Sequence, residues 1–134
     1  HIDPILAAQG VEFNQNGHQF RPDGKGGVKA DQKFWGDTNA FNQTYWRRNA
    51  TFEPSRAPHE DWVANCMAEI EVAFRWGKPA VINSHRVNYS GGIFEENRDN
   101  TLRLLDALLK AILKKWPDVE FMNSQQLGET IQNK

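Results

Sequence analysis

Two amphipathic helical patterns on either side of one short apolar run constrain the fold of this chain most. The first pattern follows Pro58 and ends before Gly77 and Pro79, and its apolar residues recur with the 3.6-residue period of a helix. The second spans Glu95 to Lys115, with acidic residues at its start and lysines at its end, as the helix dipole favours. Between them, Ala80 to Ile82 is typical of a buried parallel strand. This order predicts an α/β fold.

Weaker patterns extend the alternation toward both ends of the chain. We predict helices over His1 to Gln9 and Gln125 to Gln132, and strands over Val11 to Asn14, Tyr45 to Phe52 and Val119 to Met122. Strands that alternate with helices imply a parallel sheet with right-handed crossovers. About four strands leave open edges, which invite pairing. We therefore expect residues 1–134 to be a single domain or a fragment, the C-terminal half of a (β/α) barrel-like fold, with its edges covered by a missing N-terminal half or by self-association.

Composition narrows the classes of partner. Sixteen basic residues nearly balance seventeen acidic ones, so no general field favours nucleic acid or an anionic membrane surface. The apolar stretches are well short of the roughly 20 residues that a membrane helix needs. No signal peptide is recognisable within these residues. Any partner must therefore be recognised by particular side chains at a local site rather than by the overall charge of the chain.

A polar, glycine-rich stretch, Asn16 to Thr44, has no sustained period and is expected to be a long loop. Structureless loops longer than about 15 residues are uncommon and are usually functional or disordered. This one contains Phe34 and Trp35, which a purely solvating linker does not need. Two interpretations stay open, a substrate-covering loop with an aromatic platform and a loop anchored to the domain by its hydrophobic residues.

The run after the short buried strand is unusually polar and contains our best candidate for chemistry. It reads Asn83, Ser84, His85, Arg86, Val87, Asn88, Tyr89. Functional groups of parallel α/β proteins collect at the carboxyl ends of strands. An imidazole there can serve as a general acid or base because it titrates near neutrality. A structural histidine bonded to the backbone is the alternative for His85.

A second polar strand end contains Arg48, Asn49 and Glu53. Arginine is a rigid bidentate donor, and glutamate can be an acceptor or a base, so the group could orient a sugar hydroxyl or an acidic group of a substrate. A structural ion pair that holds the following loop is the competing interpretation. No spacing of His, Cys, Asp or Glu in the chain specifies a complete metal site.

Several segments together are similar to one known family, the secreted Bacteroidetes proteins described as polysaccharide (de)acetylase-like. The resemblance covers most of the chain from about Val11 onward. The segments that carry it are Arg48-Asn49-Ala50-Thr51-Phe52-Glu53-Pro54-Ser55, Ala73-Phe74-Arg75-Trp76, Lys78-Pro79-Ala80, Ser84-His85-Arg86-Val87-Asn88-Tyr89, Asn97-Arg98-Asp99 and Trp116-Pro117-Asp118-Val119-Glu120-Phe121-Met122.

The resemblance implies an irregular (β/α) barrel and a divalent metal, such as zinc, held by an Asp and two His from the first half of the fold. It also implies a periplasmic or secreted location and a polysaccharide or oligosaccharide substrate. His85 looks like the late-strand histidine that protonates the leaving amine, and Arg48 to Pro54 looks like the segment that shapes the groove. The family's Asp-Asp and His-x-x-x-His motifs are absent from these residues. We therefore expect this chain alone to be inactive even if its parent is an enzyme.

Three functional hypotheses follow. The first is part of a deacetylase-like hydrolase, with His85, Glu53 and Arg48 as catalytic residues and a separate set of substrate-binding residues. That set is Trp35, Asn49, Arg86, Asn88 and Tyr89. The second is a glycoside hydrolase that uses Glu53 with a carboxylate from elsewhere. The third is a non-catalytic glycan-binding module in which Trp35, Tyr45 and Tyr89 stack on sugar rings.

Overall fold

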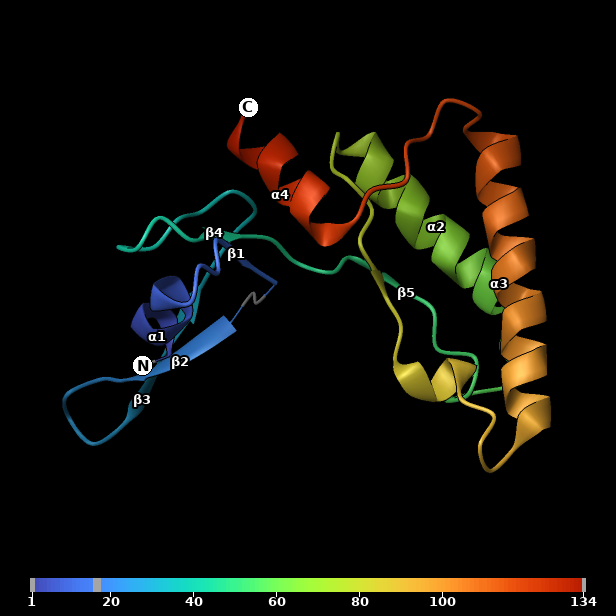
Figure 1. The fold of residues 1–134 in the computed structure, drawn as a ribbon, viewed down its shortest axis with the longest axis horizontal. Coiled ribbons are helices and arrows are strands. Elements are labelled where there is room, and N and C mark those ends of the chain that lie inside the picture. The colour runs from blue at the N-terminus through green and yellow to red at the C-terminus, as the bar shows by residue number, and fades with distance from the viewer. Residues whose placement is uncertain (1, 16–17, 134) are drawn as a thin grey trace. The chain divides into compact units, whose positions relative to one another are not determined.

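The computed structural model, which describes residues 2–15 and 18–133, contains both helices and short strands (Figure 1). The α-helices are α1 (Asp3–Ala8), α2 (Trp62–Arg75), α3 (Glu95–Lys115) and α4 (Ser124–Gln132), and a 3₁₀ helix η1 spans Arg86–Tyr89. The strands are β1 (Phe13–Asn14), β2 (His18–Pro22), β3 (Val28–Gln32), β4 (Thr44–Tyr45), β5 (Ala50–Thr51) and β6 (Ile82–Asn83). The predicted α/β class is confirmed at this level.

The chain divides into two compact units. Unit 1 comprises His1–Arg47 together with Phe121–Lys134, and unit 2 comprises Arg48–Glu120. Each unit is described by itself below. Both strand ends with predicted catalytic residues belong to unit 2.

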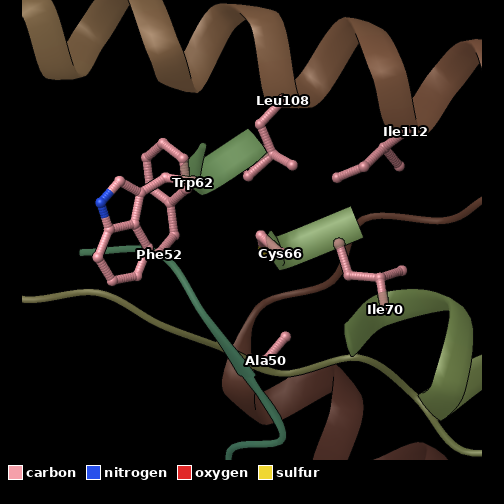
Figure 2. Packing of buried hydrophobic residues seen from close by; sticks show 7 residues of the cluster. All are labelled: Ala50, Phe52, Trp62, Cys66, Ile70, Leu108 and Ile112. Carbon is pink, nitrogen blue, oxygen red and sulfur yellow. The ribbon is translucent and has the colours of Figure 1, made fainter. Parts of the chain in front are cut away.

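Unit 2 is built on one apolar core. Helices α2 and α3 pack together, and the side chains of β5 and of the residue after it lie against them (Figure 2). The buried members of this core are Ala50, Phe52, Trp62, Cys66, Ile70, Leu108 and Ile112. The α2 members follow the helical period, so the sequence pattern correctly indicated which face is buried. The core supports the strand ends that carry the predicted site.

The helix boundaries agree with the sequence in one case and differ in two. Helix α3 has the predicted bounds. Helix α2 begins at Trp62 rather than near Pro58, because the side chain of Asp61 caps it by accepting the Ala64 N–H. Helix α4 begins at Ser124 rather than Gln125, because Asn123 caps it in a capping box with Gln126.

The predicted parallel pairing is confirmed, but the prediction of a single four-stranded sheet was wrong. Strand β1 pairs with β4 in parallel and β5 pairs with β6 in parallel, while β2 and β3 form an antiparallel hairpin. The described residues therefore make three separate two-stranded sheets and no closed barrel. The parallel strands have only two residues each, which leaves few backbone groups for further pairing.

Two predicted strands were wrong. Tyr45 to Phe52 is interrupted between β4 and β5, and at the interruption the side chain of Asn49 bonds to the backbone of Pro79 and Val81. Val119 to Met122 forms no strand. The Val119 N–H bonds to Trp116 in a turn, and the Val119 side chain packs on the unit 2 core.

The predicted structureless loop was also wrong, because Asn16 to Thr44 contains the β2–β3 hairpin (Figure 1). Asp23 organises its turn, since its Oδ1 accepts the N–H groups of Lys25 and Gly27 at 2.7 and 2.8 Å. These two hydrogen bonds lower the pKa of the Asp23 carboxyl below its usual value. Polar turn chemistry, rather than apolar alternation, therefore marks this hairpin.

Candidate functional site

The register of the β5–β6 pair places two titratable residues side by side. Ala50 lies opposite Ile82 and Thr51 opposite Asn83, and the Phe52 N–H continues the pairing by donating to the Asn83 carbonyl at 2.9 Å. The same offset brings Glu53 to His85 at the carboxyl end of both strands. Sequence reasoning had named both residues but had not paired them.

Glu53 contacts both the backbone and the ring of His85. The Oε1 atom of Glu53 accepts the His85 backbone N–H at 3.0 Å and lies 2.6 Å from the ring Nδ1. The Glu53 side chain is 8% exposed, whereas that of His85 is 67% exposed. A carboxylate at Nδ1 favours the tautomer with the proton on that nitrogen, which leaves Nε2 for an outside partner. The arrangement is suited to an oriented general acid or base.

Asn88 completes the surroundings of Glu53 from η1. Its Nδ2 donates to Glu53 Oε2 at 2.6 Å and to the His85 carbonyl at 3.0 Å, and its Oδ1 accepts the Ser55 N–H at 3.0 Å. Asn88 is 0% exposed. It therefore presents no surface to a ligand, and the predicted contact with substrate is replaced by a contact with Glu53.

The other residues named from the two strand ends differ in their surroundings. Tyr89 is half-buried, and its hydroxyl lies 2.8 Å from Ser84 Oγ. Arg86 is exposed beside His85. Arg48 is also exposed, and its guanidinium donates to Asn83 Oδ1.

Asn49 has a structural role. Its Nδ2 donates to the Pro79 carbonyl at 2.9 Å, and its Oδ1 accepts the Val81 N–H at 2.7 Å. Both ends of the amide are thus used to hold the segment that leads into β6. We do not count Asn49 among the residues that meet a ligand.

The aromatic residues predicted to stack on sugar lie in unit 1, except Tyr89. Trp35 is half-buried there. Tyr45 is 0% exposed, and its hydroxyl lies 3.3 Å from Asp3 Oδ2. A fully buried ring offers no face to a sugar, so the stacking role predicted for Tyr45 is excluded in this arrangement.

Two residues of the site were missed by sequence reasoning. Ser55 Oγ donates to Asn97 Oδ1 at 2.7 Å, and Asn97 Nδ2 donates to the Val87 carbonyl at 2.9 Å. Asn97 lies in the first turn of α3, where its polar side chain resembled an ordinary solvent-facing residue. Ser55 and Asn97 both lie in segments that carry the family resemblance, and this was the one sign in the sequence that they belong to the site.

A hollow of about 480 Å³ lies elsewhere, in unit 1. Residues 10–13, Gln15, Trp46 and the first residues of α4 line it. It contains no predicted catalytic residue. Its lining residues include neither Glu53 nor His85.

Comparison of the chain with family models, with curated proteins and with solved structures finds no match. Within the described residues, no group of three His, Cys, Asp or Glu side chains is placed to bind a metal ion. No helix in the same part of the chain has both the length and the apolar character to cross a bilayer. What the site can do is therefore argued from its own geometry.

Proposed function

We propose that this chain supplies the proton-transfer half of a hydrolase that acts on acylated glycans, of the polysaccharide deacetylase-like kind. The observation that supports it is the 2.6 Å contact between Glu53 Oε1 and His85 Nδ1, with the rest of the imidazole exposed. A histidine that is only structural usually has its ring buried with both nitrogens used. Here a nearly buried carboxylate orients a side chain that is 67% exposed.

The role of His85 is proton delivery. When an acyl group is hydrolysed, water adds to the carbonyl carbon and the bond from that carbon to the sugar nitrogen or oxygen breaks. The leaving atom needs a proton, which Nε2 of the imidazolium would donate. Glu53 contacts Nδ1 and fixes the direction of the ring, so we describe Glu53 as a positioning residue.

The family resemblance assigns water activation to a metal ion, but the described residues do not fit that group. They contain no cluster of three metal-ligating side chains. We therefore derive no step from a metal and restrict the proposal to what His85 and its partners do. The barrel-like sheet, completed by strands that pair with β5 or β6, and the periplasmic or secreted location belong to the same proposal.

The geometry favours this function over a glycoside hydrolase that uses Glu53 directly. A glycosidase carboxyl must reach the scissile bond or a water beside it. Both oxygens of Glu53 are instead occupied, Oε1 by His85 and Oε2 by Asn88, and the side chain is nearly buried. The products separate the two activities, because deacylation releases acetate whereas glycoside hydrolysis creates new reducing ends.

The experiment compares two histidine variants of the intact protein that contains this chain. Acetate release is measured from a panel of acetylated oligosaccharides, some N-acetylated and some O-acetylated. His85→Ala should lower the rate by about 10² to 10⁴-fold, the usual contribution of a general acid. His59→Ala is the matched control, because His59 is an exposed histidine of the same unit. Equal rates for the two variants and the wild type would refute the role of His85.

A further inference from the structure

Asn88 lies at the centre of the hydrogen bonds behind His85. It is fully buried, and both ends of its side-chain amide are used. The Nδ2 end contacts Glu53 Oε2 at 2.6 Å, with Ser84 Oγ at 3.3 Å and the His85 carbonyl at 3.0 Å around it. The Oδ1 end accepts the Ser55 N–H at 3.0 Å. Asn88 thus joins the segment after β5 to the segment after β6.

The contact with Glu53 has a specific chemical consequence. The two Glu53 oxygens both contact nitrogen atoms, namely the backbone and ring nitrogens of His85 at Oε1 and the amide of Asn88 at Oε2. A carboxylate can rotate about its last bond, which would take Oε1 away from the ring. A donor fixed at Oε2 opposes that rotation and keeps Oε1 at Nδ1.

We infer that Asn88 is a positioning residue that holds Glu53 in the orientation which fixes the His85 tautomer. Ser55 and Asn97 form the outer part of the same network, since Ser55 Oγ donates to Asn97 Oδ1 and Asn97 Nδ2 donates to the Val87 carbonyl. This outer part ties the network to the first turn of α3. The effect on catalysis rests on the proposed function, whereas the effect on the tautomer does not.

The test uses two substitutions at Asn88 and one control. Asn88→Ala removes the donor to Glu53 and the acceptor for Ser55. Asn88→Asp keeps the shape and the acceptor for Ser55 but places a carboxyl oxygen against Glu53, and two carboxylates this close cannot both be ionised comfortably. Asn97→Ala is the matched control, because it removes an asparagine from the outer part of the network only.

The test measures the tautomer of the His85 ring and the exchange rate of its Nδ1 proton. NMR of the intact protein with ¹⁵N-labelled histidine gives both. The chain has four histidines, and loss of a signal in His85→Ala assigns the one required. In the wild type and in Asn97→Ala we expect the proton on Nδ1, with slow exchange. In both Asn88 variants the Nδ1–H signal should shift upfield and exchange with water at least 10-fold faster.

Activity provides the second readout. If His85 is the general acid, Asn88→Ala should lower kcat on the order of 10-fold to 100-fold, as loss of an orienting partner commonly does, and change KM little. A folded Asn88 variant with an unchanged Nδ1–H signal would overturn the inference, whatever its activity. Absence of hydrolysis in the wild type, with the predicted NMR changes, would instead refute the proposed function and leave the positioning role standing.

Discussion

The two units of the molecule are stabilised in different ways. Unit 2 buries a continuous apolar cluster between α2, α3 and β5 (Figure 2). Unit 1 buries several polar side chains beside its aromatic ones, and these are Asp3, Gln43 and Thr44. Gln43 there donates to the Val11 carbonyl at 2.8 Å and accepts from Asn39 Nδ2 at 2.7 Å. Unit 2 also buries the polar side chains of Glu53, Asn88 and Thr101, but among the described residues its buried apolar side chains outnumber these, whereas unit 1 buries polar and apolar side chains in equal number.

This difference explains where the candidate chemistry lies. A side chain used for proton transfer must keep its geometry, and rigid supporting elements provide that. Phe52, a core residue with 0% exposure, directly precedes Glu53 in the chain. The orienting carboxylate therefore directly follows a residue of the apolar core of unit 2, while the imidazole that it holds remains exposed.

The largest expected effect is loss of a core aromatic residue in unit 2. Phe52→Ala should destabilise the unit by about 3–5 kcal/mol, because a fully buried ring leaves a cavity. Residue-resolved hydrogen exchange measures it through the amides of α2 and α3. Phe94→Ala, at a 72% exposed position of the same unit, is the control and should change stability by less than about 0.5 kcal/mol. Similar effects of the two variants would show that apolar burial does not stabilise unit 2, which would contradict the comparison between the units.

A smaller effect is expected from a buried polar residue of unit 1. Gln43→Ala removes the donor to the Val11 carbonyl and one of the two acceptors of Asn39 Nδ2, which should cost about 1–3 kcal/mol. Gln132→Ala removes the part-buried hydrogen bond that this exposed side chain donates to Thr44 Oγ1 in the same unit, and it should cost less, about 0.5–1.5 kcal/mol. Hydrogen exchange of the amides around β1 and β4 would show whether this ranking holds.

The smallest effect concerns Cys66 in the unit 2 core. Burial, and next the charge of Glu69, raise the pKa of this thiol from 9.0 to about 12. The folded state therefore retains the proton that the unfolded state loses, so stability is fully present below pH 9 and falls as the pH rises toward 12, by at most about 1.4 kcal/mol per pH unit. Urea unfolding of the wild type and Cys66→Ala at pH 8 and 10 measures the difference. An equal pH dependence of the two would show that Cys66 is not protected in the core.

How much of the fold the sequence could predict depends on whether an element is stabilised by apolar packing or by polar hydrogen bonds. Helices α2 and α3 were predictable because their apolar residues recur with the helical period and pack on one core. The β2–β3 hairpin was missed because its turn depends on the side chain of Asp23, not on alternation of apolar residues. The strand predicted at Val119 to Met122 failed because Val119 packs on the unit 2 core without pairing, while Phe121 and Met122 are exposed.

The sequence predicted which residues belong to the site but not which of them contact one another. The rule that functional groups collect at strand carboxyl ends indicated His85 and Glu53 separately. Their pairing depends on the β5–β6 register, which single strands of two residues do not reveal. The complete burial of Asn88 could not be predicted, because nothing in its local sequence indicates it.

Substitution of Glu53 tests the central claim most directly, namely that a buried carboxylate orients His85 for proton transfer. In Glu53→Gln the side chain keeps its size, but an amide that also carries donors replaces an acceptor-only group at Nδ1 and at Asn88. Acetate release by the intact protein should fall by about 10² to 10⁴-fold, as when the orienting acid of a histidine is replaced by its amide. Wild-type kcat in a folded Glu53→Gln protein would contradict the account.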